Sequence, residues 1–213
     1  MTAPVEHGDT SARRPPGAAV TSDLAIELIK INKRFGAVHA NRDIDLQVRR
    51  GTVHGIVGEN GAGKSTLMSI LYGFYTADSG EIRVDGTPHA ITDSRHALAL
   101  GIGMVHQHFM LVDNFTVLEN VVLGAEDSAM LGPSLARARA ELLRLEQDYN
   151  LEVDPDALIE DISVGAQQRV EILKALYRGA DVLILDEPTA VLTPQEAIEL
   201  FGIIRSLQAD GKS

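Results

Sequence analysis

The order of apolar and polar positions predicts several strands in the first part of the chain. Residues 24–29 and 44–48 largely alternate between apolar and polar side chains, as strands with one buried face do. Residues 52–57 form a short, mostly apolar run that ends at a glycine-rich turn, and residues 65–71 continue as an apolar helical segment, which predicts a strand, a loop and a helix. Residues 82–84 predict another short strand, closed by an Asp-Gly turn.

The middle of the chain changes to a helical pattern. Thr116 and Glu119 have the spacing of a capping box ahead of an apolar stretch. Residues 134–149 repeat apolar side chains on one helical face, with Arg and Glu opposite. That face carries Leu135, Ala138, Leu142, Leu145 and Tyr149.

The end of the chain returns to a strand followed by a helix. Residues 181–187 contain an uninterrupted apolar run, Val182 to Leu185, typical of a strand that is covered on both faces. Thr193, Pro194 and Glu196 then supply an N-cap, a proline at the first helical position and a glutamate at the third. The helix is expected to end near Gly211, because glycine is favoured just past a helix.

These patterns divide the chain into a disordered arm and one folded unit. Residues 1–23 are rich in Pro, Gly, Ser and Thr and too poor in apolar residues to bury a core. Residues 24–107 and 176–213 predict an α/β core, and about residues 108–175 predict a helical insert.

Composition narrows the classes of function. The 213 residues include 30 acidic and 19 basic side chains, with a formal net charge of −11, which argues against nucleic acid as a partner. The chain has no cysteine, so disulfides and thiolate metal sites are excluded. No apolar run approaches the roughly 20 residues that cross a bilayer, so any membrane connection is expected to run through a partner.

Residues 58–65 have the spacing of a phosphate-binding loop and lie between a predicted strand and a predicted helix. Glycines let successive amides point at an anion, and the following helix adds the positive end of its dipole. Lys64 supplies a charge for the β- and γ-phosphates, and Ser65 supplies a hydroxyl for Mg²⁺. The alternative without a binding function is a glycine-rich turn in which Lys64 lies in solvent. A phosphate loop alone is also compatible with a kinase, a GTPase, a motor protein or a transporter. The predicted ATP contacts here are Gly58, Glu59, Asn60, Gly61, Ala62, Gly63, Lys64, Ser65 and Thr66.

Two carboxylates end the last predicted strand. Ligands of open α/β sheets gather at the carboxyl ends of the strands, where Asp186 and Glu187 lie. Asp186 suits the Mg²⁺ shell, because hard cations prefer oxygen ligands, and Glu187 is the candidate catalytic residue that polarises the attacking water. An ordinary solvent-exposed strand exit is the alternative, and the upstream phosphate loop favours catalysis.

Three further segments resemble the ATP-binding cassette family. Residues 162–169 read Ile-Ser-Val-Gly-Ala-Gln-Gln-Arg and resemble its signature motif, usually Leu-Ser-Gly-Gly-Gln. Gln107 matches the family's Q-loop glutamine, which implies a contact with ATP and with Mg²⁺, and Phe35 matches the aromatic residue that stacks on adenine. The resemblance runs from about Leu24 to the C-terminus.

The resemblance implies a fold, a reaction and partners. The fold is an α/β phosphate-loop NTPase cassette with a parallel core sheet, an antiparallel β portion and a helical insert. The branch that the chain is most similar to, on residues 101–112 and 163–169 among others, imports nucleosides and simple sugars by ATP hydrolysis with Mg²⁺. It implies a peripheral place on the cytoplasmic face of the cell membrane, a transmembrane permease, a second cassette and, indirectly, an extracellular substrate-binding protein. Across the cassette pair, the ATP held by one partner would meet the other's Ser163, Val164, Gly165, Ala166 and Gln167.

The sequence departs from the family in several places. Val164 and Ala166 replace a signature glycine and glutamine, and Thr193 stands where many cassettes have an aspartate. The family also has a further core strand, beside the phosphate-loop strand, that carries a switch histidine and would follow Ser213. His106 and His108, beside Gln107, are instead expected to serve the strand end or the membrane-subunit contact. The chain is therefore expected to be a C-terminally truncated cassette that binds ATP poorly and hydrolyses it slowly.

Two other functions stay open. A soluble cassette ATPase of DNA repair or translation is expected to have long coiled-coil insertions or basic patches, which this short insert and acidic chain do not favour. A remnant that binds nucleotide without turnover is opposed by the intact Lys64, Asp186 and Glu187, although truncation could have the same effect.

Overall fold

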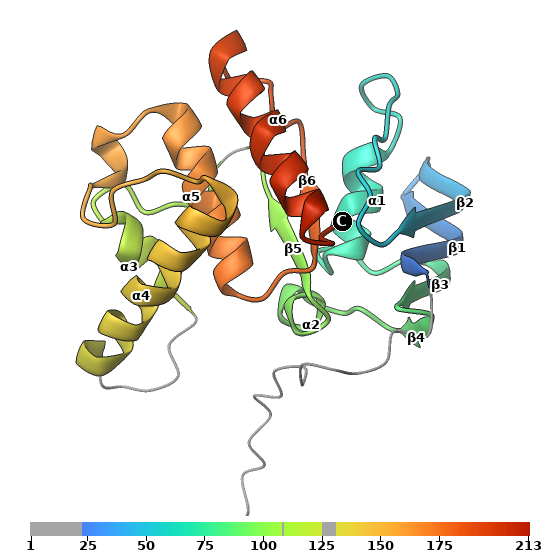
Figure 1. The fold of residues 1–213 in the computed structure, drawn as a ribbon. Coiled ribbons are helices and arrows are strands. Elements are labelled where there is room, and N and C mark those ends of the chain that lie inside the picture. Colours follow the sequence, from blue (N-terminus) through green and yellow to red (C-terminus); the bar gives the residue numbers. More distant parts are fainter. Residues whose placement is uncertain (1–22, 108, 125–130) are drawn as a thin grey trace, which may run out of the picture.

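The computed structural model describes residues 23–107, 109–124 and 131–213 (Figure 1), so the predicted arm lies outside them except for Asp23. The described part mixes strands and helices along the chain, and the helices between residues 117 and 177 are grouped at the end of the molecule away from the antiparallel strands (Figure 1). In chain order its elements are β1 (Leu24–Phe35), β2 (Val38–Arg49), α1 (Lys64–Leu71), β3 (Ser79–Val84), β4 (Thr87–His89), α2 (Ser94–Ala99), β5 (Ile102–Val105), α3 (Val117–Val122), α4 (Leu131–Tyr149), the 3₁₀ turn η1 (Ile159–Asp161), α5 (Val164–Tyr177), β6 (Val182–Leu185) and α6 (Pro194–Ala209).

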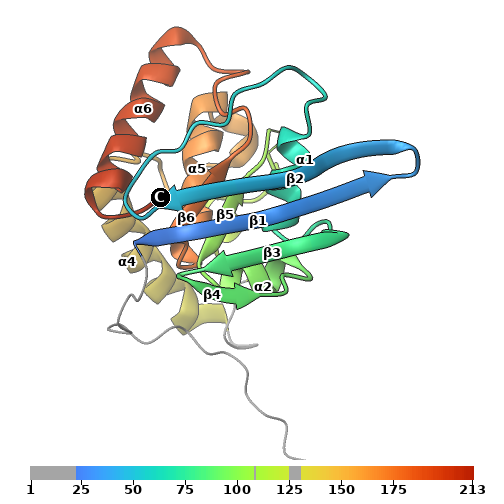
Figure 2. The same ribbon diagram turned by 90° about the vertical axis from the view of Figure 1, so that its right-hand side faces the viewer.

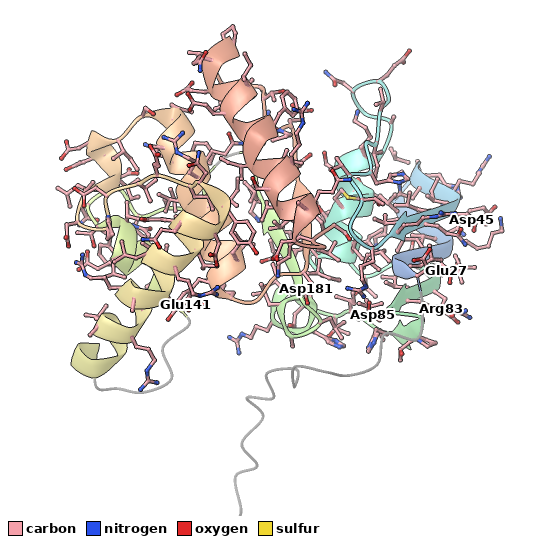
Figure 3. The ribbon with its side chains drawn as sticks, viewed as in Figure 1. Glu27, Asp45, Arg83, Asp85, Glu141 and Asp181 are labelled. Atoms are coloured by element: carbon pink, nitrogen blue, oxygen red, sulfur yellow. The ribbon has the colours of Figure 1, made fainter. Side chains whose placement is uncertain are left out.

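An antiparallel sheet in the order β2-β1-β3-β4 forms one side of the molecule (Figure 2). Its inner face packs Ile26, Leu28 and Ile31 into the core, and these side chains are buried. On the outer face Glu27 and Arg83 pair across neighbouring strands at 3.7 Å (Figure 3). The strands predicted at 24–29, 44–48 and 82–84 are confirmed, because each lies within a strand of this sheet.

A parallel pair of strands, β5 and β6, lies between the antiparallel sheet and the helical part (Figure 1). Val105 at the end of β5 is paired with Leu185 at the end of β6. Gln107 and Asp186, which follow these strands, therefore lie at the same carboxyl end of the strand pair. On the other edge of β6, the amide of Leu183 donates to the carbonyl of Ser213 at 2.8 Å, and the amide of Ser213 donates to the carbonyl of Asp181 at 3.0 Å. Asp181 also receives Lys212 Nζ at 2.9 Å (Figure 3).

The helical part has its own apolar core. Leu142, Leu145 and Tyr149 of α4 are buried against residues of α3 and α5, which confirms the predicted apolar face. Both predicted capping boxes, at Thr116 and Thr193, are present. None of the helices within the described ranges is long and apolar enough to span a bilayer.

The strand predicted at residues 52–57 is wrong, because the structure has no strand there. Val53 is 61% exposed and Val57 is 96% exposed. A strand needs a neighbour to accept and donate its backbone hydrogen bonds, and this segment has no strand partner among the described residues. A cleft of about 420 Å³ lies instead between this segment, β6 and α6, and its lining includes Val53, Ile56, Val182, Leu185, Phe201 and Ile204.

Candidate nucleotide-binding site

The phosphate loop leads into α1 through backbone conformations that favour glycine. Gly61 has φ 82° and Gly63, the N-cap of α1, has φ 86°, a region that other residues enter only with strain. A Cβ on Gly63 would lie 2.2 Å from the carbonyl oxygen of Ala40. The first turn of α1 has no side-chain cap, so the amides of its start are placed to meet an external anion.

Lys64 folds back over the loop. Its Nζ donates to the carbonyl oxygens of Gly58 at 2.7 Å and Glu59 at 2.9 Å. These contacts hold the ammonium group close to the place where phosphate oxygens are expected. Because charged groups prefer charged acceptors, a phosphate is able to replace the two carbonyls.

The loop and the end of β6 meet through Ser65 and Asp186. Ser65 Oγ lies 3.3 Å from Asp186 Oδ1, although the two residues are 121 positions apart. The amide of Asp186 donates to the carbonyl of Val105 at 3.1 Å, so the parallel pairing of β5 and β6 holds it in place. The structure therefore brings together two of the three predicted oxygen donors for Mg²⁺, Ser65 and Asp186.

Glu187 adopts a left-handed backbone conformation with φ 48°, which costs free energy in a residue other than glycine. Its neighbour Pro188 is held by Gln168 of α5, whose Nε2 donates to the Pro188 carbonyl at 2.7 Å. Lys64, Asp186 and Glu187 all line the cleft beside β6. The predicted catalytic carboxylate thus lies on the same cleft as Lys64 of the phosphate loop.

Gln107 and Phe35 lie at the margins of this arrangement. Within the described residues no hydrogen bond joins Gln107 to Ser65 or Asp186; it lines a separate hollow of about 310 Å³ with Val164 and Gln167. Phe35, at the end of β1, is 42% exposed, and its ring lies edge-on to Tyr75 at 5.1 Å between centroids. Their roles as ATP contacts stay predictions.

The signature segment begins α5, and its hydrogen bonds stay within the chain. Ser163 is the N-cap, and its Oγ accepts from the amide of Ala166 at 3.2 Å. The amide of Gly165 donates to Glu196 Oε1 at 3.1 Å, and Ser163 Oγ lies 3.4 Å from the same oxygen. Gln167 Nε2 donates to the Ile159 carbonyl at 3.1 Å. The contact of this segment with a phosphate of a second cassette stays a prediction.

Glu196 carries its negative charge between two helix starts. Its other oxygen, Oε2, accepts from the amide and the hydroxyl of Thr193, both at 2.9 Å. Hydrogen bonds from Thr193, and then from Gly165 and Ser163, lower the pKa of Glu196. One carboxylate therefore caps α6 and also binds the N-terminus of α5.

Two residues of α5 that support the site, Glu171 and Lys174, were not predicted from the sequence. Buried Glu171 of α5 accepts from the amide of Met110 at 2.7 Å, and Lys174 donates to the Met110 carbonyl at 2.7 Å, so both fix the segment after Gln107. Burial lowers the pKa of Lys174. The sequence did carry a signal for them, namely polar residues at helical positions that are expected to be buried. A search for apolar periodicity alone does not detect such residues.

Of the two histidines beside Gln107, only His106 lies within the described residues. The ring of His106 stacks on Phe74, with 5.4 Å between centroids, and burial lowers its pKa. His106 therefore serves the packing at the end of β5, one of its two predicted roles. His108 lies outside the described residues.

The sequence is similar to known ATP-binding proteins over most of its length. The sequence profile of the ABC transporter family matches residues 41–190. The chain is 53% identical over 194 residues to the nucleoside import ATP-binding protein NupA of Lactococcus lactis, covering 91% of this chain and 38% of that protein. It is 53% identical over 191 residues to the guanosine import ATP-binding protein NupO of Bacillus subtilis, covering 90% and 38%. It is 47% identical over 193 residues to the ribose import ATP-binding protein RbsA 1 of Burkholderia thailandensis, covering 89% and 38%. The chain thus spans well under half the length of these relatives.

Solved structures agree with the fold. The ADP conformation of an ATP-binding cassette of an ABC transporter superposes with a TM-score of 0.78 at 25% identity, covering 89% of this chain and 79% of that one. A dimeric bacterial ABC transporter cassette superposes with a TM-score of 0.73 at 27% identity, covering 88% and 84%. The mixed α/β arrangement described above is therefore an ABC cassette fold, as predicted.

Proposed function

The chain belongs to the ABC transporter family, and from that premise we propose that it is an ATP-binding, ATP-hydrolysing cassette of a membrane importer. One observation carries the proposal: Lys64 of the phosphate loop, Asp186 and Glu187 line one cleft, and Ser65 Oγ lies 3.3 Å from Asp186 Oδ1, although the loop and the strand end are far apart in the sequence. This set contains a cradle for the phosphates, oxygen donors for a cation and a carboxylate for the attacking water.

The residues present fit Mg²⁺ as the cation. Ser65 Oγ and Asp186 Oδ1 are hard oxygen donors that lie 3.3 Å apart, as two ligands of one small cation do. Bound Mg²⁺ supplies positive charge that offsets the charge developing on the phosphates. Ser65 and Asp186 would hold it together with phosphate oxygens, and Gln107 is the predicted third protein ligand.

The protein's own side chains and amides bind the nucleotide and orient the attacking water in this proposal. Lys64 exchanges its loop carbonyls for β- and γ-phosphate oxygens, and the amides at the start of α1 orient those phosphates. Glu187 accepts a hydrogen bond from the attacking water and orients it toward the γ-phosphorus. Phe35 is proposed to stack on the adenine.

The proposed cargo is a nucleoside or a simple sugar. Support comes from the relatives, which are named as import ATP-binding proteins for nucleosides, guanosine and ribose. The proposed partners are a transmembrane permease, a second cassette and, indirectly, an extracellular substrate-binding protein. The proposed location is the cytoplasmic face of the membrane. A dimeric cassette among the similar structures supports the pairing.

A second candidate function is nucleotide binding without turnover. Two features favour it: residues 52–57 have no strand partner among the described residues, and a cleft lies beside Glu187. A catalytic carboxylate works best when its surroundings are fixed and exclude water.

Turnover of MgATP by the purified protein, with Glu187→Gln as the variant, separates the two candidates. The ATPase proposal expects turnover that Glu187→Gln reduces by two or more orders of magnitude while MgATP affinity is retained. Binding without turnover in the parent protein supports the second candidate, and equal turnover in parent and variant removes Glu187 from its role. Uptake of labelled guanosine and ribose by cells with and without the gene tests the cargo.

A further inference from the structure

Strand β2 contains a bulge shortly before it reaches the phosphate loop. Ile31 of β1 is paired with Ile44, but Lys33 is paired with Asn41, so β2 uses three residues where β1 uses two. Asp43 lies in this bulge with φ 44°. The side chain of Asn32 of β1 makes two hydrogen bonds to Asp43. Its Oδ1 accepts from the amide of Asp43 at 3.1 Å, and its Nδ2 donates to Asp43 Oδ1 at 2.9 Å.

The extra residue changes which side chains of β2 face inward. After the bulge the inward positions are Ile44, Leu46 and Val48, which pack against the core. Because side chains of a strand alternate, position 42 would face inward if the strand were regular. The bulge reverses the alternation, so Arg42 is exposed and Asn41 is buried, with 3% of its surface exposed.

The buried amide of Asn41 meets the phosphate loop. Its Nδ2 donates to the carbonyl of Gly63 at 3.0 Å, and the same carbonyl accepts the first helical hydrogen bond of α1, from the amide of Leu67, at 3.0 Å. The other atom of the side-chain amide, Oδ1, is buried without a hydrogen-bond partner among the described residues. An unpaired buried acceptor costs free energy, which an apolar side chain of similar size would avoid.

The hydrogen bond constrains the peptide that contains the amide of Lys64. The peptide unit is planar, and in its trans form the carbonyl of Gly63 and the N–H of Lys64 point in opposite directions. A donor that holds the carbonyl toward β2 therefore turns the Lys64 N–H toward the interior of the loop, where phosphate is expected.

We propose that Asn41, aimed by the bulge at Asp43, is a positioning residue for the phosphate loop. It holds the Gly63 carbonyl so that the first amide of α1 stays directed at the phosphates before nucleotide arrives. The proposal rests on the proposed function, since it assumes that this loop binds the phosphates of a nucleotide.

Two substitutions and one matched control test this role. Asn41→Asp keeps the shape but replaces the donor with an acceptor that repels the Gly63 carbonyl, and Asn41→Leu removes the polar group. Gln47→Leu is the control, because Gln47 is an exposed amide on the same strand whose side chain binds Glu27. We expect MgADP affinity to fall by about tenfold in the Asp variant and by about fivefold in the Leu variant, with no change in the control.

Adenosine separates positioning from a general structural effect. It has no phosphate, so its affinity is expected to be equal in the parent, in both Asn41 variants and in the control. If adenosine and MgADP affinity fall together, or if both Asn41 variants bind MgADP as tightly as the parent, the proposal is overturned.

Backbone amide exchange at residues 61–66 gives a measurement that needs no nucleotide. Exchange in this segment is expected to be about tenfold faster in Asn41→Asp than in Gln47→Leu, because a hydrogen bond that holds the loop has been lost. Failure of the parent to bind MgADP would count against the proposed function, whereas equal exchange in the two variants would count against Asn41. Should neither Asn41 variant fold, the side-chain amide signals of Asn41 in the parent decide: a larger change than at Gln47 upon MgADP addition is expected, and an equal change refutes the proposal.

Discussion

The helices α1 and α5 both begin at segments that the sequence marks as phosphate contacts, and their first turns are completed in different ways. At α1 the N-cap is Gly63, which has no side chain to accept from the helix amides. At α5 the N-cap is Ser163, whose hydroxyl accepts from Ala166, and Glu196 accepts from Gly165. The start of α5 therefore has its anion inside the protein, while the start of α1 depends on one from outside.

The difference shows which amides of each helix start the protein's own side chains satisfy. The start of α5 is stable by itself, because a hydroxyl and a carboxylate already satisfy its amides. The start of α1 is held from behind, by Asn41 and by the close approach of Ala40 to Gly63. A phosphate gains unoccupied amides at α1, whereas at α5 it must compete with Glu196 for the amide of Gly165.

The largest expected effect comes from adding one methyl group at the start of α1. Gly63→Ala places a Cβ 2.2 Å from the Ala40 carbonyl at φ 86°, so both strain and displacement follow. We expect the free energy of unfolding to fall by about 3 kcal/mol. Chemical denaturation measures this. Gly36→Ala is the matched control, because Gly36 has φ 57° but no atom within 4 Å of its Cβ position, and an equal loss in both variants would contradict the clash.

The next effect is on affinity. Lys64→Ala removes the ammonium group, which donates to two loop carbonyls and is proposed to donate to phosphate oxygens instead when nucleotide binds. MgATP affinity is expected to fall by about thirtyfold. Titration calorimetry measures the loss. Lys30→Ala, at an exposed lysine paired with Asp45, is the control, and comparable affinities in all three proteins would exclude Lys64 from phosphate binding.

A smaller effect is expected at the other helix start. Ser163→Ala removes the N-cap hydroxyl of α5, and the free energy of unfolding should fall by about 1 kcal/mol. MgATP affinity of a single chain should not change, since the start of α1 is the proposed phosphate site. Parallel denaturation and binding measurements check both statements, and a loss of affinity equal to that of Lys64→Ala would remove the distinction between the two helix starts.

The smallest expected effect is a change in pH dependence. The pKa of Glu196 is lowered in the folded protein, so its stabilising contribution is present above the ordinary glutamate value of about 4.3 and is lost as pH falls through the lowered pKa. The difference in melting temperature between the parent and Glu196→Gln should therefore shrink from pH 7 to pH 3. Glu199→Gln, on the same helix and paired with Arg169, is the control. A difference that does not vary with pH would show that the charge of Glu196 has no part in capping.

Much of the local structure could be predicted because its signals lie close together in the chain. The capping boxes at Thr116 and Thr193 and the apolar face of α4 depend on residues within a few turns of one another, and all were confirmed. The segment 52–57 failed because an apolar run specifies burial and a strand tendency but cannot supply the neighbouring strand.

By itself, the sequence determined the motif of a phosphate loop and an acidic strand end, since each rests on residue types at short spacings, and it predicted the cassette fold through the resemblance carried by Phe35, Gln107 and residues 162–169. Only the tertiary structure decided that Ser65 meets Asp186, that Asn41 rather than its neighbour faces the loop, and that Glu196 occupies the start of α5. The physical reason is that hydrogen bonds and steric contacts depend on distance in space, and a single bulge or a parallel strand pair sets those distances between residues far apart in the chain.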